Sequence, residues 1–157
     1  MENVMNNSRL KLAISVIIFI ILILGVFSCN STDVINTSFE VLENCNLQNV
    51  DSIANGTGLS AVELVIANQS DYEKYIVYNG PMEVDFNEEF VIAGRSTWQT
   101  HGVRVKEQSL QLISDILRYR VIIGDMDYQM PERAEYGIVV SKAYMNYQVD
   151  FIVEKED

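Results

Sequence analysis

Short runs rich in β-branched residues recur along the chain from residue 39 onward, and several alternate apolar with polar positions. Residues 117–123 read Leu-Arg-Tyr-Arg-Val-Ile-Ile, which has the period of a strand with one buried face. Continuous apolar runs at 61–67 and 89–94 are typical of core strands. The expected strands are 39–42, 61–67, 89–94, 102–106, 109–112, 117–123, 136–140 and 147–153.

One short helix is expected near residues 70–78. Ser70 and Glu73 have the spacing of a capping box, and Asn79-Gly80-Pro81 supplies a stop signal. About seven or eight short strands with one helix favour a mainly β, β-rich α+β domain. The expected architecture is an antiparallel sandwich or an open barrel.

The N-terminal region has a different pattern, with one long apolar run in place of short alternating ones. Residues 12–27 are interrupted only by Ser15, and the run follows Arg9 and Lys11. Its length suits the hydrophobic part of a signal peptide and falls short of the ~20 residues of a membrane-spanning helix. Residues 1–28 are therefore expected to form an N-terminal signal helix for export.

The end of the apolar run, Val26-Phe27-Ser28-Cys29, resembles a bacterial lipobox, with Phe27 where a small residue is usual. The resemblance implies that Cys29 is the lipid attachment site, carrying diacylglycerol and palmitate, and that residues 1–28 are removed. Several acyl chains would anchor the chain stably to a membrane of the bacterial cell envelope, at the periplasmic or outer-membrane face. The alternative is an uncleaved anchor at 12–27 with Cys29 unmodified.

Polar residues 29–38 are expected to tether the lipid to a single globular domain of residues 39–157. The chain has 11 Lys+Arg and 22 Asp+Glu; removing residues 1–28 takes away two basic residues and one acidic residue, leaving 9 and 21, a formal charge of −12. This charge disfavours nucleic acid as a partner and disfavours electrostatic docking on anionic lipid. Any membrane association must therefore come from the anchor.

No residue spacing typical of a catalytic centre or of a phosphate-binding loop occurs in the chain. The single histidine, His101, could act as a general base, but no nucleophile motif accompanies it. We therefore expect no enzymatic activity and no cofactor. Trp98 and His101 share a polar stretch between two expected strands, which makes them candidate contacts for a partner. If Cys29 is lipidated, Cys45 is either a reactive thiol or a small buried side chain.

Two acidic stretches invite a calcium interpretation, namely Asp125-Met126-Asp127 with Glu132, and Asp85 with Glu88-Glu89. Neither has the alternating ligands and central glycine of a calcium loop, so we expect solvated turns and no metal site. The eight tyrosines leave glycan or protein contact open. Asp51-Ser52-Ile53 is similar to a bacterial O-glycosylation site, with Ser52 as acceptor.

The order of features from about Ala61 to Lys155 resembles the C-terminal domain of the PrcB-like family, whose members belong to a protease complex. The matching segments are Leu64-Val65-Ile66, Ser70-Asp71-Tyr72-Glu73-Lys74-Tyr75, Val84-Asp85-Phe86-Asn87-Glu88-Glu89-Phe90-Val91-Ile92, the loop from Arg95 to Gly102, and Tyr147-Gln148-Val149-Asp150-Phe151-Ile152-Val153. The chain has Thr100-His101-Gly102 where the family tends to have Thr-Gly-Gly. The resemblance implies a non-catalytic accessory domain that binds or stabilises a protein partner, such as a secreted protease. A domain that binds a small ligand, a glycan or calcium is the alternative.

Overall fold

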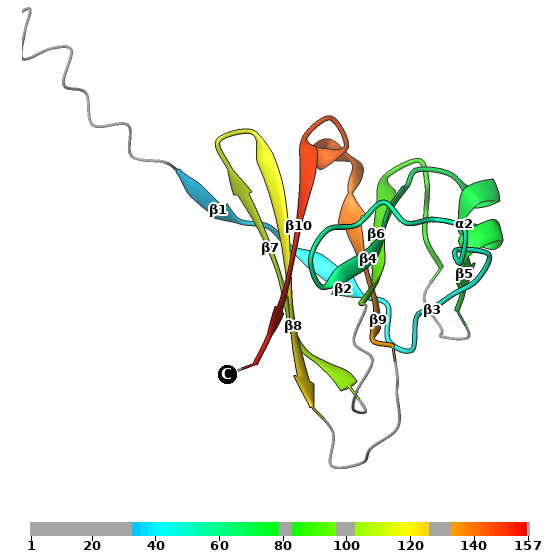
Figure 1. Ribbon diagram of the computed structural model, residues 1–157. Helices are drawn as coiled ribbons and strands as arrows, with labels where there is room; N and C mark the ends of the chain where they lie inside the picture. Colours follow the sequence, from blue (N-terminus) through cyan, green and yellow to red (C-terminus); the bar gives the residue numbers. More distant parts are fainter. Residues whose placement is uncertain (1–32, 79–82, 97–102, 126–132, 157) are drawn as a thin grey trace, which may run out of the picture. The chain divides into compact units, whose positions relative to one another are not determined.

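The computed structural model describes residues 33–78, 83–96, 103–125 and 133–156, which belong to one compact unit, Asp33–Asp157 (Figure 1). Most of the described residues are in strands, as expected. The strands are β1 (Val34–Asn36), β2 (Phe39–Val41), β3 (Asn46–Leu47), β4 (Ser60–Ile66), β5 (Ile76–Val77), β6 (Glu89–Ser96), β7 (Val103–Ile113), β8 (Ile116–Asp125), β9 (Glu135–Ser141) and β10 (Gln148–Lys155). The helices are α2 (Gln69–Tyr75) and the 3-10 helix η1 (Lys142–Tyr144).

Two four-stranded sheets face each other, which confirms the β-rich sandwich. Sheet A has the order β1-β7-β8-β10 and sheet B the order β2-β9-β6-β4, while β3 and β5 pair separately. The sandwich is not wholly antiparallel, because β10 runs parallel to β8. The chain leaves β8, passes through β9 in sheet B, and reverses at η1 before it returns to sheet A (Figure 1). This route through the opposite sheet supplies the long crossover that a parallel pair needs.

A single long hairpin, β7 and β8, forms the centre of sheet A. The strand expected at 102–106 and the one expected at 109–112 are both parts of β7, whose register shifts between Val105 and Glu107. This bulge interrupts the alternation of side chains, so one strand looks like two in the sequence. Ser114 and Asp115 close the hairpin with φ values of 47° and 67°, the left-handed conformations of a tight two-residue turn.

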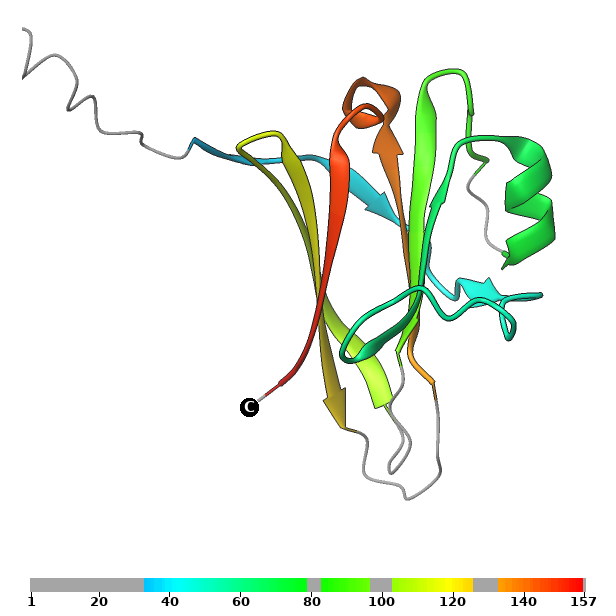
Figure 2. The same cartoon turned by 45° about the horizontal axis from the view of Figure 1, so that its top comes forward.

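Sheet B is buried on both faces. From β6, Phe90 and Ile92 pack into the cluster between the sheets, whereas Val91 and Ala93 pack into a second cluster on the other face. The second cluster is covered by the segment 42–53, by β5 and by α2, so that sheet B lies between sheet A and the helix (Figure 2). Burial on both faces explains why β6 has a continuous apolar sequence.

The helix begins two residues earlier than the capping box predicted, and it ends at Tyr75, where β5 follows, instead of near residue 78. Its N-cap is Asn68, whose Oδ1 accepts a 2.9 Å hydrogen bond from the Asp71 amide. Ser70 therefore lies inside the first turn, and Glu73 accepts a hydrogen bond from Gln69 Nε2 at 2.8 Å. Asparagine is as good an N-cap as serine, so the sequence offered two starting points and the earlier one is used.

The folded unit includes residues that the sequence analysis assigned to the tether. Strand β1 pairs antiparallel with β7, with Val34 opposite Ile113 and Asn36 opposite Gln111. Thr37 is buried, and its amide donates to the Leu110 carbonyl at 3.0 Å where the chain crosses to sheet B. Residues 34–38 are thus held by the domain because the β7 backbone supplies their hydrogen-bond partners.

Candidate functional site

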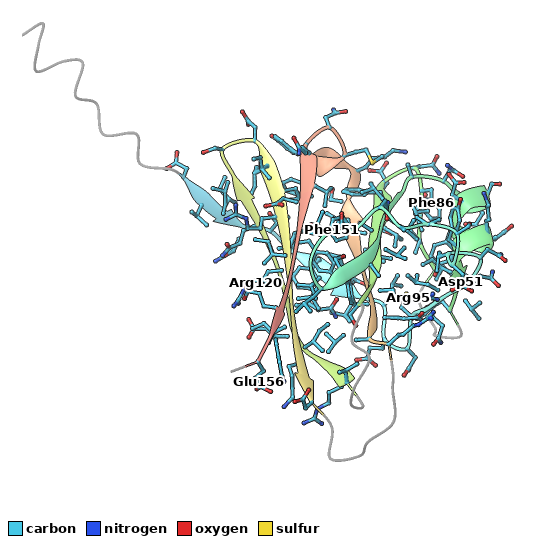
Figure 3. All side chains as sticks on the ribbon, in the orientation of Figure 1. Asp51, Phe86, Arg95, Arg120, Phe151 and Glu156 are labelled. Atoms are coloured by element: carbon cyan, nitrogen blue, oxygen red, sulfur yellow. The ribbon has the colours of Figure 1, made fainter. Side chains whose placement is uncertain are left out.

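The most extensive buried polar cluster in the described residues surrounds Arg95, at the end of β6. The Arg95 side chain is 10% exposed, and its Nε lies 2.6 Å from Glu135 Oε1. Its Nη1 lies 2.8 Å from Asp51 Oδ1, and its Nη2 donates to the Leu47 carbonyl at 2.9 Å. Glu135 Oε2 in turn accepts a 2.8 Å hydrogen bond from the Leu47 amide. Figure 3 shows Arg95 and Asp51 close together at this end of the molecule.

This arrangement uses each nitrogen of the guanidinium group for a contact inside the chain. A buried charge of this kind is tolerated because it is paired and hydrogen-bonded. The contacts fasten the backbone at Leu47, and with it the covering segment 42–53, to sheet B. The Arg95 cluster is therefore a clamp within the fold, and it leaves no buried donor directed at a ligand.

Asp51 is the exposed member of the Arg95 cluster, with a side chain that is 84% exposed. The hydrogen bond from Arg95, followed by the charge of Arg95, lowers the pKa of Asp51 below its usual value. Arg133 adds a smaller contribution at 3.4 Å. Asp51 is consequently a carboxylate at neutral pH and is unsuited to the role of a general acid.

Cys45 lies under sheet B with a residue exposure of 5%. Burial, followed by the charge of Glu135, raises the pKa of its thiol to about 12. A thiol that reacts as a nucleophile needs a lowered pKa and access to solvent. The structure therefore favours the second of the two interpretations of Cys45, a small buried side chain.

Two tyrosines in edge-to-face contact place hydroxyl groups in the core between the sheets. The rings of Tyr119 and Tyr136 meet edge to face with centroids 5.9 Å apart. The Tyr119 hydroxyl donates to Gln108 Oε1 at the β7 bulge, and the Tyr136 hydroxyl lies 3.3 Å from Ser60 Oγ. Burial raises the pKa of Tyr136 to about 12 and raises that of Tyr119 well above its usual value, so both remain protonated phenols with structural partners.

The clefts of the described surface are open depressions with mixed linings. One of about 470 Å³ lies between β2 and β7, and one of about 410 Å³ lies beside β2 and β9. The first includes Phe39, Val41, Glu43, Val105, Glu107 and Tyr136. Neither cleft brings a nucleophile and a base together, so the described part of each offers a contact surface and no reaction centre.

The outer face of sheet A carries rows of opposite charges. The cross-strand ion pairs there are Arg118 with Asp150 at 3.2 Å, Arg120 with Glu154 at 2.6 Å, and Lys106 with Glu156 at 3.0 Å. Figure 3 shows Arg120 and Glu156 on this face. Because these pairs are partly exposed, each contributes at most about 1 kcal/mol to stability. The face is therefore polar and solvated around these pairs.

The acidic stretches differ from calcium loops where the structure describes them. Asp85 Oδ1 accepts hydrogen bonds from the amide and from Nδ2 of Asn87, both at 2.9 Å, and Glu89 Oε2 accepts one from the Asp85 amide at 3.1 Å. Asp125 forms an ion pair with Lys155 at 3.0 Å. Asp127 and Glu132 lie outside the described residues. Within the described ranges, no three His, Cys, Asp or Glu side chains gather as metal ligands.

Of the other residues singled out in the sequence, Ser52 is described, and it is exposed in a turn beside Asp51. The carboxylate of Asp51 is turned to Arg95, and Ile53 packs against the apolar cluster under sheet B. Cys29, Trp98 and His101 lie outside the described residues, as does the expected signal helix. No helix within the part of the chain that the structure describes is long and apolar enough to cross a membrane.

Sequence reasoning missed the Arg95 cluster. Arg95 and Glu135 are 40 residues apart, and each looks like an ordinary charged residue at the end of a strand. The one available signal is that Arg95 follows an unbroken apolar run, where a charge needs a buried partner.

No protein-family model, no curated protein and no solved structure matches the chain. The resemblance to the PrcB-like family consequently has no support from a family match and stays a prediction.

Proposed function

We propose that the chain is a lipid-anchored exported domain that binds or stabilises a protein partner and has no catalytic activity. The observation that carries the proposal is that the buried charge of the domain is fully paired within the chain. Arg95, the buried charged side chain among the described residues, is matched by Glu135, Asp51 and the Leu47 carbonyl within the chain itself. Binding of other molecules is therefore left to the surface of the domain.

Two features of the sequence support the anchoring and the partner. The lipobox-like Val26-Phe27-Ser28-Cys29 supports lipid attachment at Cys29 in the cell envelope. The PrcB-like order of segments supports a protein partner, with a secreted protease complex as the specific candidate. The acidic character of the exported part, with a formal charge of −12, suits a partner with a basic surface.

Intact mass and membrane fractionation of the wild type beside Cys29→Ala test the anchor. We expect the wild type to lack residues 1–28, to carry acyl mass and to sediment with membranes. Cys29→Ala should carry no acyl mass. If both proteins keep the full N-terminus and stay on the membrane, the lipid anchor is wrong.

Quantitative capture from detergent-solubilised membranes tests the partner. We expect one protein to co-purify in a stoichiometric amount after mild cross-linking, and to be lost in the double variant Trp98→Ala with His101→Ala. Arg120→Ala, on the solvated face of sheet A, is the matched control. Recovery of no stoichiometric protein would contradict an interaction domain.

A further inference from the structure

The strand nearest the N-terminus of the described unit carries its most exposed large apolar side chains. Val34 is 54% exposed and Ile35 is 51% exposed, compared with 45% for Val65 and 38% for Val77. Soluble domains normally protect an edge strand with charges, with proline or with a cover. Strand β1 is at the edge of sheet A and has two adjacent apolar residues instead.

The neighbouring strands extend this apolar surface. Val34 is the register partner of Ile113, and Ile113 is the partner of Ile116 across the hairpin turn. Register partners project from the same face of a sheet, so the three side chains form a row across β1, β7 and β8. Ile35 is the register partner of Leu112 and projects from the opposite face of β1. The exposed edge strand is therefore apolar on both faces at this end of sheet A, beside the Ser114–Asp115 turn.

The length of chain between this end and the proposed lipid is short. Val34 follows Cys29 by five positions, and an extended chain over those five steps spans at most roughly 18 Å. The headgroup region on one side of a bilayer is itself roughly 5–8 Å thick. An acyl group on Cys29 would therefore hold β1 within reach of the membrane interface at all times.

We propose that the apolar end of sheet A, formed by β1 and the β7–β8 hairpin, is the membrane-facing surface of the domain, with Val34 and Ile35 in contact with lipid. This inference rests on the proposed lipid attachment at Cys29. A few apolar side chains bind a bilayer weakly, but the anchor makes the contact intramolecular and raises its effective concentration. Asp33 and Asp115 flank the surface, so it suits zwitterionic lipid in preference to anionic lipid.

The test uses the mature lipidated protein in phosphatidylcholine vesicles, with an environment-sensitive fluorophore on a single added cysteine. Ile35→Cys and Val34→Cys report on the apolar end, while Val65→Cys and Val77→Cys are matched controls at exposed apolar positions elsewhere. The buried Cys45 thiol, with its pKa of about 12, does not compete for the label. Acyl mass on Cys29 is measured on the same samples, and circular dichroism checks that each variant is folded.

We expect vesicles with brominated acyl chains to quench the label at positions 34 and 35 at least twofold more than at positions 65 and 77. Equal quenching at all four positions on acylated protein would overturn the membrane-facing surface and leave the anchor intact. Protection of position 35 from aqueous iodide without quenching by brominated lipid would also overturn it, since a second copy or a protein partner then covers β1. Absence of acyl mass would overturn both the anchor and the inference.

Discussion

Arg95 and Glu135 are bound to each other twice, as register partners on β6 and β9 and through a 2.6 Å contact between Nε and Oε1. The backbone pairing places the two side chains on the same face of sheet B. The same two residues hold both the amide and the carbonyl of Leu47. A single cross-strand pair thus joins the sheet to the segment that covers it.

The first prediction concerns the stability that this pair provides. We expect Glu135→Ala to lower the free energy of unfolding by about 3 kcal/mol, because it leaves the buried guanidinium of Arg95 with fewer partners. Urea unfolding of residues 29–157, followed by circular dichroism, measures the change. Glu154→Ala, which removes the exposed partner of Arg120, is the control and should cost under about 1 kcal/mol. Equal effects of the two variants would contradict a clamping role.

The second prediction concerns the loss of stability at acidic pH. Arg95 lowers the pKa of Asp51 in the folded state, so the contribution of Asp51 to stability is present above its unfolded pKa of about 3.9. The contribution is lost as the pH falls through the lower folded pKa. Between pH 5 and pH 2 the wild type should therefore lose more stability than Asp51→Asn. Urea midpoints at several pH values measure the difference, which should shrink in 1 M salt because Asp51 is exposed.

The third prediction concerns the reactivity of Cys45. With the pKa of the thiol raised to about 12, only about one molecule in 10⁴ is a thiolate at pH 8. We expect iodoacetamide to leave Cys45 unmodified for hours in the folded Cys29→Ala protein and to modify it fully in 8 M urea, as read by mass spectrometry. Rapid alkylation of the folded protein at pH 8 would show that the thiol is accessible.

The fourth prediction concerns the close approach of Gly94 and Tyr136. A Cβ atom added at Gly94 would lie 2.5 Å from the ring of Tyr136, which is itself buried. Gly94→Ala should therefore cost about 1–3 kcal/mol of stability through overpacking. The double variant Gly94→Ala with Tyr136→Leu should be less destabilised than the sum of the two single variants, because leucine vacates the ring's position. If the losses of stability were additive, contact between the added Cβ and the Tyr136 ring would not be their cause.

The parts of the fold that the sequence predicted are those with a strong local pattern. Strand β8 alternates over most of its length, and β6 is continuously apolar from Phe90 to Gly94, so both are recognisable without knowledge of their partners. Strands β1, β3 and β5 have two or three residues each and exist because another strand supplies hydrogen bonds to them. No short sequence window contains that information.

The direction of β10 and the existence of the Arg95 cluster could not be predicted from the sequence, for the same reason. Whether β10 pairs parallel or antiparallel depends on the path through β9 and η1, which alternation of side chains does not encode. The cluster joins Asp51, Arg95 and Glu135, which are separated by 44 and 40 residues. Charged residues at such separations are usually solvated, so sequence alone gives no reason to pair them.

The double burial of sheet B also constrains how the chain can assemble. Val91, Ala93 and Val139 are covered by residues that precede β6, whereas Phe90, Ile92 and Ile138 are covered largely by residues that follow it. A partly folded domain in which β4, β6 and β9 have paired, but in which one covering layer is not yet in place, therefore exposes an apolar face of sheet B. Partly folded species with such exposed faces aggregate. Transfer across a membrane in an unfolded state would postpone this danger until the whole sequence is available, and both layers could then close on sheet B within a single cooperative event.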